Sequence, residues 1–112
     1  MTIDELKEEV ITGLTVELNS DPDFSAEILE QKVENVVNEI IHARRYAQAG
    51  YSDERIEADM ENYISNIRNI ALYDYNQSGL DFQSSHTENG TSRSFMSRNR
   101  LFYGILPLAR QL

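Results

Sequence analysis

Apolar residues recur at intervals of three and four along most of the chain, which is the spacing of one face of an α-helix. Thr2 and Glu5 have the spacing of a capping box, in which the threonine hydroxyl and the glutamate carboxylate each bind a backbone N–H group at a helix start. The pattern therefore predicts a short N-terminal helix over residues 3–18. Its inward positions are expected to be Ile3, Leu6, Val10, Ile11 and Leu14.

A broader apolar stripe follows the turn-forming sequence NSDPDFS and predicts a long second helix. Pro22 lies among turn residues, and either Asp23 or Ser25 can cap the new helix. The stripe continues to about Ala49, and Gly50 is suited to end the helix in a left-handed conformation. The inward positions are expected to be Ile28, Leu29, Val33, Val36, Val37, Ile40, Ile41 and Ala47.

A third long helix is predicted between Ser52, a good N-cap residue, and Gly79. Two acidic residues follow Ser52 in the first turn, where the helix dipole favours negative charge. The short Gly50-Tyr51 connection makes the second and third helices antiparallel neighbours. The inward positions are expected to be Ile56, Met60, Tyr63, Ile64, Ile67, Ile70, Ala71 and Tyr75.

The hydrophobic pattern stops near residue 80. SSHTENGTSRSF, residues 84–95, contains almost no side chain that a core would bury. Asn89-Gly90 favours a two-residue type I′ turn between flanks of matched length, but the flanks lack alternating apolar residues, so a polar hairpin and a loop over residues 82–95 both stay open. Beyond it, residues 96–103 predict a short helix, and Pro107 ends regular structure.

Together these elements predict a mainly α protein of one domain. We expect a small helical bundle with two long antiparallel helices, in which residues 1–79 form the core and residues 80–112 form a projecting hairpin or loop and a C-terminal tail. The length of 112 residues and the 40% hydrophobic content fit one small core. The sequence lacks a run of roughly 20 apolar residues and the regions of a signal peptide, so we expect a soluble, unexported protein without glycosylation at Asn89.

Charge is unevenly distributed along the chain, whose formal net charge is -9. Residues 1–34 carry ten acidic side chains and two lysines, whereas residues 80–112 carry two acidic side chains and four arginines. The acidic excess argues against phosphate binding as the main function. Opposite charges at the two ends allow head-to-tail association between copies, although a solvated helical surface also explains the acids. The internal pair Arg44-Arg45 is explained by a helix C-terminus, where the dipole favours cations.

Residues with catalytic or metal-binding chemistry are few. The chain has no cysteine, and His42 and His86 have no third ligand at a recognisable spacing. Asp53, Glu57 and Glu61 are spaced by four residues, which places them together on a solvated helix surface. Nucleotide-binding and hydrolase motifs are absent from the sequence. We therefore expect no enzyme activity, no cofactor and no metal ion.

Basic and aromatic residues alternate near the C-terminus. This composition fits single-stranded nucleic acid, on which aromatic rings stack, but arginine and aromatic residues are also enriched in protein interfaces. The overall acidity favours the protein interface. The residues concerned are Arg93, Phe95, Arg98, Arg100, Phe102 and Tyr103.

The order of these segments resembles the small, mostly helical head-tail connector (adaptor) proteins of tailed bacteriophages and prophages. The resemblance spans nearly the whole chain, and none of the segments that carry it is a catalytic signature. They are IDELKEEV, IIHARRY, YSDERIEADMENYISNIRNIALYDYNQSG, SHTENGTSRSF and GILPLAR.

The resemblance implies a structural subunit that assembles, as about a dozen copies, into a ring beneath the portal protein at one capsid vertex. Its partners would be neighbouring copies, the portal protein, the next connector or stopper protein, and DNA that passes through the channel without sequence-specific binding. The protein would assemble in the host cytoplasm and reside at the head-tail interface of the virion. The implied contact residues are Asn89, Gly90, Arg93 and Phe95 in the projecting element, and Arg98, Arg100, Leu106, Pro107 and Arg110 in the tail.

Two other functions fit the same residues. One is a small helical regulator or inhibitor that binds a single protein partner through the face of the second and third helices. The other is a nucleic-acid-binding accessory protein that uses the basic tail.

Overall fold

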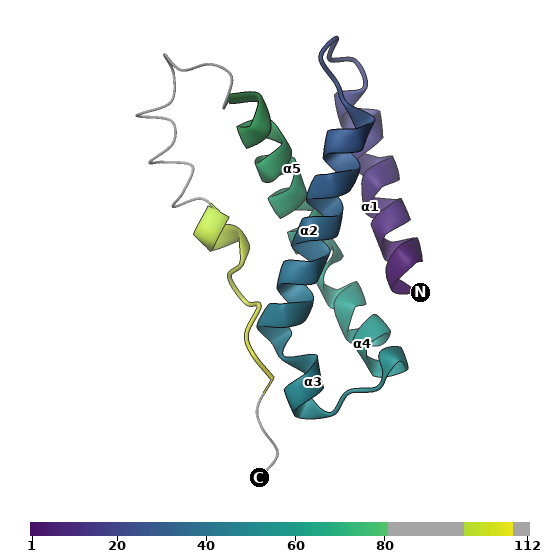
Figure 1. Ribbon diagram of the computed structural model, residues 1–112, viewed down its shortest axis with the longest axis vertical. Coiled ribbons are helices and arrows are strands. Elements are labelled where there is room, and N and C mark those ends of the chain that lie inside the picture. Colours follow the sequence, from purple (N-terminus) through teal and green to yellow (C-terminus); the bar gives the residue numbers. More distant parts are fainter. Residues whose placement is uncertain (81–97, 109–112) are drawn as a thin grey trace.

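Three helices form the body of the protein in the computed structural model, which describes residues 1–80 and 98–108 (Figure 1). Helix α2 (Ala26–Arg44) runs opposite to α1 (Ile3–Leu18) and to α5 (Ile64–Leu80), and α1 and α5 also contact each other. No strand occurs in the two described stretches. The predicted mainly α bundle with antiparallel long helices is confirmed.

Local capping determines where the helices begin, as the sequence predicts. The backbone N–H of Glu5 donates to Thr2 Oγ1 at 3.1 Å, and the Thr2 N–H donates to Glu5 Oε1 at 2.8 Å, which completes the capping box of α1. Ser25, rather than Asp23, caps α2, and Ser52 caps the helix that follows the Gly50-Tyr51 connection. Each cap binds backbone N–H groups that a helix leaves unpaired at its start.

The predicted second helix is interrupted, which corrects its extension to Ala49. Helix α2 ends at Arg44, because Arg45 adopts a left-handed conformation with φ 57° and ψ 47°, and a short α3 (Tyr46–Ala49) follows. Gly50 then ends α3 at φ 73°. A continuous helix with 100° per residue would place Tyr46 about a third of a turn away from the centre of the buried stripe. The turn at Arg45 instead directs Tyr46 into the core, where it is 2% exposed.

The predicted third helix is also interrupted. It consists of α4 (Asp53–Met60), a single 3₁₀ turn η1 (Glu61–Tyr63) and α5. At η1 the Tyr63 ring lies against the guanidinium of Arg44, with the Arg44 Cζ atom 5.3 Å from the ring centroid. This contact joins residues that are far apart along the chain, so the local pattern that predicted one straight helix does not contain it.

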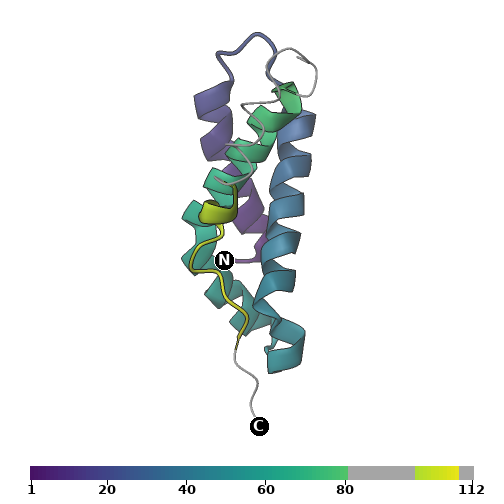
Figure 2. The ribbon, with the colours of Figure 1, turned by 90° about the vertical axis from the view of Figure 1, so that its left-hand side faces the viewer.

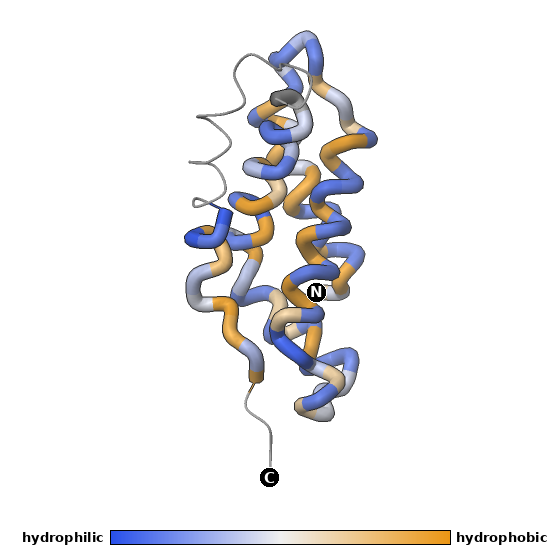
Figure 3. The backbone as a smooth tube through the Cα atoms, turned by 60° about the vertical axis from the view of Figure 1, so that its left-hand side comes forward, coloured by the Kyte–Doolittle hydropathy of each residue, from blue (hydrophilic) through white to orange (hydrophobic). Residues whose placement is uncertain are grey.

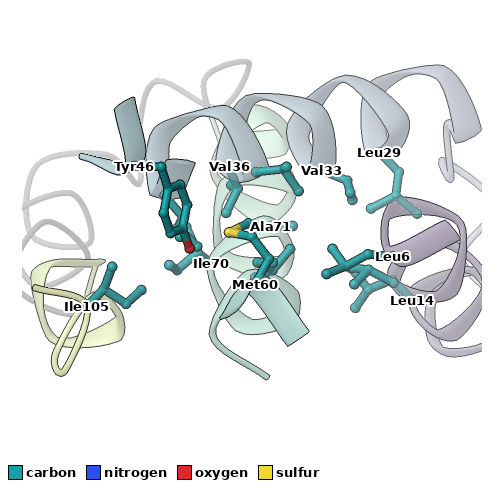
Figure 4. Packing of buried hydrophobic residues seen from close by; sticks show 14 residues of the cluster. Leu6, Leu14, Leu29, Val33, Val36, Tyr46, Met60, Ile70, Ala71 and Ile105 are labelled. Atoms are coloured by element: carbon teal, nitrogen blue, oxygen red, sulfur yellow. The ribbon is translucent and has the colours of Figure 1, made fainter. Parts of the chain in front are cut away.

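The core lies between α1, α2 and α5. Hydrophobic and hydrophilic residues alternate along each of these helices, as expected where one face is buried (Figure 3). In Figure 4, Leu6 and Leu14 of α1 lie at one end of the core and Ile105, from the C-terminal segment, at the other. Buried hydrophobic residues are Leu6, Val10, Leu14, Leu29, Val33, Val36, Val37, Ile40, Tyr46, Met60, Ile67, Ile70, Ala71 and Ile105.

Two positions predicted to face inward are exposed. Ile28 is 37% exposed, because Leu29 and Val33 occupy the core-facing side at the start of α2. Ala47 is exposed because the left-handed Arg45 changes the helical phase, so that its neighbour Tyr46 is buried instead. The remaining inward positions of α2 are buried or half-buried, so the predicted stripe is correct up to the point where the helix ends.

Candidate functional site

Residues 98–108 lie along the body, against α2 and α5, and we call them the C-terminal strap (Figures 1 and 2). The strap begins with one helical turn over residues 98–101 and continues without regular structure toward α3. The predicted helix at residues 96–103 is thus present as this single turn in the described part. Gly104 provides the bend between the two parts with φ 90°, a value that favours glycine.

Arg98 fixes the first end of the strap. Its Nε donates to Asp74 Oδ1 at 2.8 Å, and its Nη2 donates to Asp74 Oδ2 at 2.9 Å and to Glu39 Oε1 at 2.7 Å. The bidentate pair with Asp74 raises the pKa of Arg98, and Glu39 adds to this effect against the opposing influence of burial. One guanidinium therefore joins α2, α5 and the strap, and two carboxylates surround its charge.

Backbone contacts and one apolar side chain hold the rest of the strap. Asn66 Nδ2 on α5 donates to the Leu101 carbonyl at 3.0 Å. The Leu108 N–H donates to the Arg44 carbonyl at 3.0 Å, at the end of α2. Between these points Ile105 is 8% exposed and belongs to the core. The strap is consequently part of the folded body along its described length.

Arg44 connects the strap to α3 and α4. Its Nη1 donates to the Leu106 carbonyl at 2.7 Å, and its Nε donates to Asp59 Oδ2 at 3.0 Å. The Tyr46 hydroxyl donates to the same Asp59 oxygen at 2.6 Å. We call Arg44, Asp59 and Tyr46 the Arg44 cluster. Arg44 thus binds a carboxylate and the strap, beyond the helix-end role that the sequence predicted for the Arg44-Arg45 pair.

The pKa values within the Arg44 cluster follow from its burial and hydrogen bonds. Burial opposes the charge of Arg44, but the hydrogen bonds with Asp59 and Tyr46 together raise the pKa of the guanidinium. Burial is the main cause that raises the pKa of the Tyr46 hydroxyl, and its hydrogen bond to Asp59 adds to it. Tyr46 therefore remains a hydrogen-bond donor well above neutral pH. The cluster is built to hold elements together.

The outward side of the strap presents apolar side chains to solvent. Tyr103 is 88% exposed and Leu106 is 65% exposed, and Pro107 and Arg100 beside them are also exposed. Of the predicted contact residues in the strap, Arg98 is thus turned inward, whereas Arg100, Leu106 and Pro107 are available to a partner. The predicted contact residues Asn89, Gly90, Arg93, Phe95 and Arg110, and the hairpin or loop at residues 82–95, lie outside the described residues.

A hollow of ≈ 390 Å³ lies beside the strap, where it meets the end of α2 and α3. Arg45, His42 and Gln48 line one side, and Ile105 and Pro107 of the strap line the other. His42 is exposed on α2. Across residues 1–80 and 98–108, no three histidine, cysteine or acidic side chains are placed to hold a metal ion.

The partners that fix the strap escape sequence analysis. Arg98 binds acidic residues that lie 24 and 59 positions away, and Arg44 binds Asp59 across a turn. The sequence marks Arg98 as basic among aromatic residues but gives no spacing that assigns Glu39 or Asp74 to it. None of the described helices is both long and apolar enough to cross a membrane.

Comparison of the chain with protein-family models, with curated proteins and with solved structures finds no match.

Proposed function

We propose that this protein is a structural head-tail connector subunit, a ring-forming adaptor of a tailed phage or prophage that binds the portal protein. The observation that carries the proposal is the two-sided C-terminal strap. Arg98 and Arg44 fix its inward side to the body, while Tyr103 and Leu106 face solvent. Exposed aromatic and aliphatic side chains on a fixed backbone are typical of protein interfaces. The order of the sequence segments resembles that of connector proteins, and this resemblance indicates the kind of assembly.

The acidic surface supports the same proposal. The chain carries a net charge of -9, and several helices expose carboxylates, among them Glu27 and Glu30 of α2 and Glu54 of α4. Negative surfaces repel the phosphate backbone, so DNA can pass a ring of such subunits without binding to it. The expected partners are accordingly proteins: neighbouring copies, the portal protein, and the next connector or stopper protein.

A nucleic-acid-binding accessory protein is less well supported. Arg98, the first described arginine of the basic tail, is paired with Asp74 and Glu39, so its charge is compensated within the chain. A single-partner regulator that used the face of α2 and α5 would first have to displace the strap, because Ile105 is packed there. A regulator that used the outward side of the strap is the second candidate, since the same exposed Tyr103 and Leu106 serve it.

Electron microscopy of the chain mixed with the portal protein of the same phage or prophage tests the proposal. A ring of subunits on one end of the portal is the expected result. The double substitution Tyr103→Ser with Leu106→Ser should prevent ring formation while the helical circular dichroism of the chain stays unchanged. Absence of any complex would contradict the proposal, and a complex with one subunit would favour the regulator.

A further inference from the structure

Two exposed faces of opposite character lie at opposite edges of the body. The strap forms one edge and α1 forms the other, with α2 and α5 between them (Figures 1 and 2). We define the strap face as Arg100, Tyr103, Leu106 and Arg45, and the α1 face as Asp4, Glu8, Glu9, Thr12 and Val16.

The strap face is apolar and basic. Tyr103 and Leu106 are the most exposed large hydrophobic residues of the strap, at 88% and 65%. Arg100 lies along the same strap, and Arg45 lines the hollow beside Pro107. Neither arginine forms an ion pair with a described residue. Two guanidinium groups that no described residue pairs with therefore flank exposed apolar side chains, a composition that is enriched in protein interfaces.

The α1 face complements the strap face in charge and in apolar surface. Val16 is 73% exposed, and it lies one helical turn beyond Thr12 and Gly13. Gly13 and Thr12 line a hollow of ≈ 660 Å³ along the helix, together with Glu5, Glu8 and Glu9. Asp4, Glu8 and Glu9 have no ion-pair partner within the described stretches. This face thus offers an apolar strip, formed by Gly13 and Val16, beside acidic side chains that no described residue pairs with.

We propose that the strap face of one copy docks on the α1 face of a second copy of this chain. The inference rests on the proposed function in taking another copy as the occupant. Arg100 and Arg45 lie opposite the acidic side chains of α1 in this arrangement, while Tyr103 and Leu106 cover the strip beside Val16. Complementary charge steers such encounters and fixes their orientation.

The two faces exclude a symmetric pairing of like with like. An α1 face against an α1 face brings Asp4, Glu8 and Glu9 of both copies together, and like charges at an interface are repelled. A head-to-tail contact avoids this repulsion. Because its two surfaces lie at opposite edges of one molecule, each copy can bind two neighbours, and the repeated contact forms a ring where the rotation between neighbours closes.

Cysteine pairing tests the contact directly, because the chain has no cysteine of its own. Thr12→Cys places a thiol on the α1 face, Tyr103→Cys places one on the strap face, and Ser65→Cys serves as the control at an exposed position of α5. On mixing the first two variants under oxidising conditions, we expect the mixed disulfide to exceed either homodimer. Mixed product no greater than that formed with the control variant would overturn the inference.

Charge reversal tests the electrostatic part by sedimentation of the full-length chain at low salt. Reversal of the α1 face by Glu8→Arg with Glu9→Arg, or of the strap face by Arg45→Glu with Arg100→Glu, should each weaken association roughly tenfold. An equal mixture of the two variants should associate again, which also shows that both remain folded. A wild-type chain that stays monomeric into the millimolar range, or a mixture without rescue, would overturn the inference.

The disulfide experiment and the portal experiment can fail independently. Rings on the portal without the mixed disulfide mean that this contact is wrong while the connector role holds. The mixed disulfide without portal binding means that the contact is right and the connector role is wrong.

Discussion

Replacement of Asp59 by asparagine isolates the contribution of the Arg44 cluster to stability. The substitution keeps the shape of the side chain but removes its negative charge. In the wild type, Asp59 Oδ2 accepts hydrogen bonds from both Arg44 Nε and the Tyr46 hydroxyl. Arg44 would keep its bond to the Leu106 carbonyl, so its positive charge would remain in place without a counter-charge. We expect the Asp59→Asn variant to fold and to be less stable.

The magnitude follows from burial. The side chains of Arg44 and Asp59 are 11% and 18% exposed, so solvent screens the pair much less than it screens a surface ion pair. Hydrogen bonds to charged groups contribute about 1.5–3 kcal/mol each, and both bonds here end on one oxygen, so an asparagine carbonyl oxygen in that position accepts both as weaker neutral bonds. Loss of the charge from both bonds and of the charge compensation should lower the free energy of unfolding by about 2 kcal/mol.

Urea unfolding at neutral pH measures this change, with Tyr46→Phe as the matched control. Removal of the Tyr46 hydroxyl alone should cost about 1 kcal/mol, because one hydrogen bond is lost while the ion pair stays. The double variant should lose less than the two single losses combined, since both substitutions act on the same Tyr46-Asp59 bond. If Asp59→Asn stays within about 0.5 kcal/mol of the wild type, the pair contributes no more than a surface ion pair and the reasoning is refuted.

Three further predictions concern the backbone, the pH dependence and the core. Arg45→Gly should stabilise the chain by about 1 kcal/mol, because Arg45 has a left-handed φ of 57°, and Gly50→Ala should destabilise it by about 1 kcal/mol, because Gly50 has a φ of 73°. Urea midpoints of the two variants that fail to move in opposite directions would contradict this. The pKa of Tyr46 is raised in the folded state, so its contribution to the free energy of unfolding is fully present below the unfolded tyrosine pKa of about 10 and is lost as the pH rises further. The free energy of unfolding should therefore fall above about pH 10, and it should fall less in the Tyr46→Phe variant. Ile70→Ala should lower the free energy of unfolding by about 2–5 kcal/mol, whereas Val16→Ala, on a position that is 73% exposed, should change it by less than about 0.5 kcal/mol in thermal and urea unfolding alike.

The bundle could be predicted because its helices are encoded by neighbouring residues. The spacing of Leu6, Val10 and Leu14 specifies the buried face of α1, and Thr2 with Glu5 specifies its start. The same reasoning located the start of α4 at Ser52 and limited the cap of α2 to Asp23 or Ser25, of which Ser25 is the one that caps it. Caps and periodic stripes act within four residues, which is the range over which a single sequence is informative.

The interruptions escaped prediction because tertiary contacts cause them. An arginine has no preference for a left-handed conformation, so nothing local marks Arg45 as the end of α2. The turn becomes favourable once Tyr46 is buried and its hydroxyl reaches Asp59 at 2.6 Å, thirteen residues further on. Helix propensity favoured continuation of α2 beyond Arg44, but the burial of one tyrosine outweighed that preference.

Arg98 and Arg100 show why the candidate site needed a structure. In the sequence the two arginines are equivalent, two residues apart in the same basic and aromatic segment. In the folded chain Arg98 holds the strap to α2 and α5 through Glu39 and Asp74, while Arg100 is exposed. Substitution of Arg98 would free the first end of the strap and so displace Arg100 and the residues toward Tyr103, while Arg44 still holds the Leu106 carbonyl. A loss of association caused by an Arg98 substitution would therefore report on the position of the strap. Only a loss of association caused by an Arg100 substitution would report on a contact with a partner.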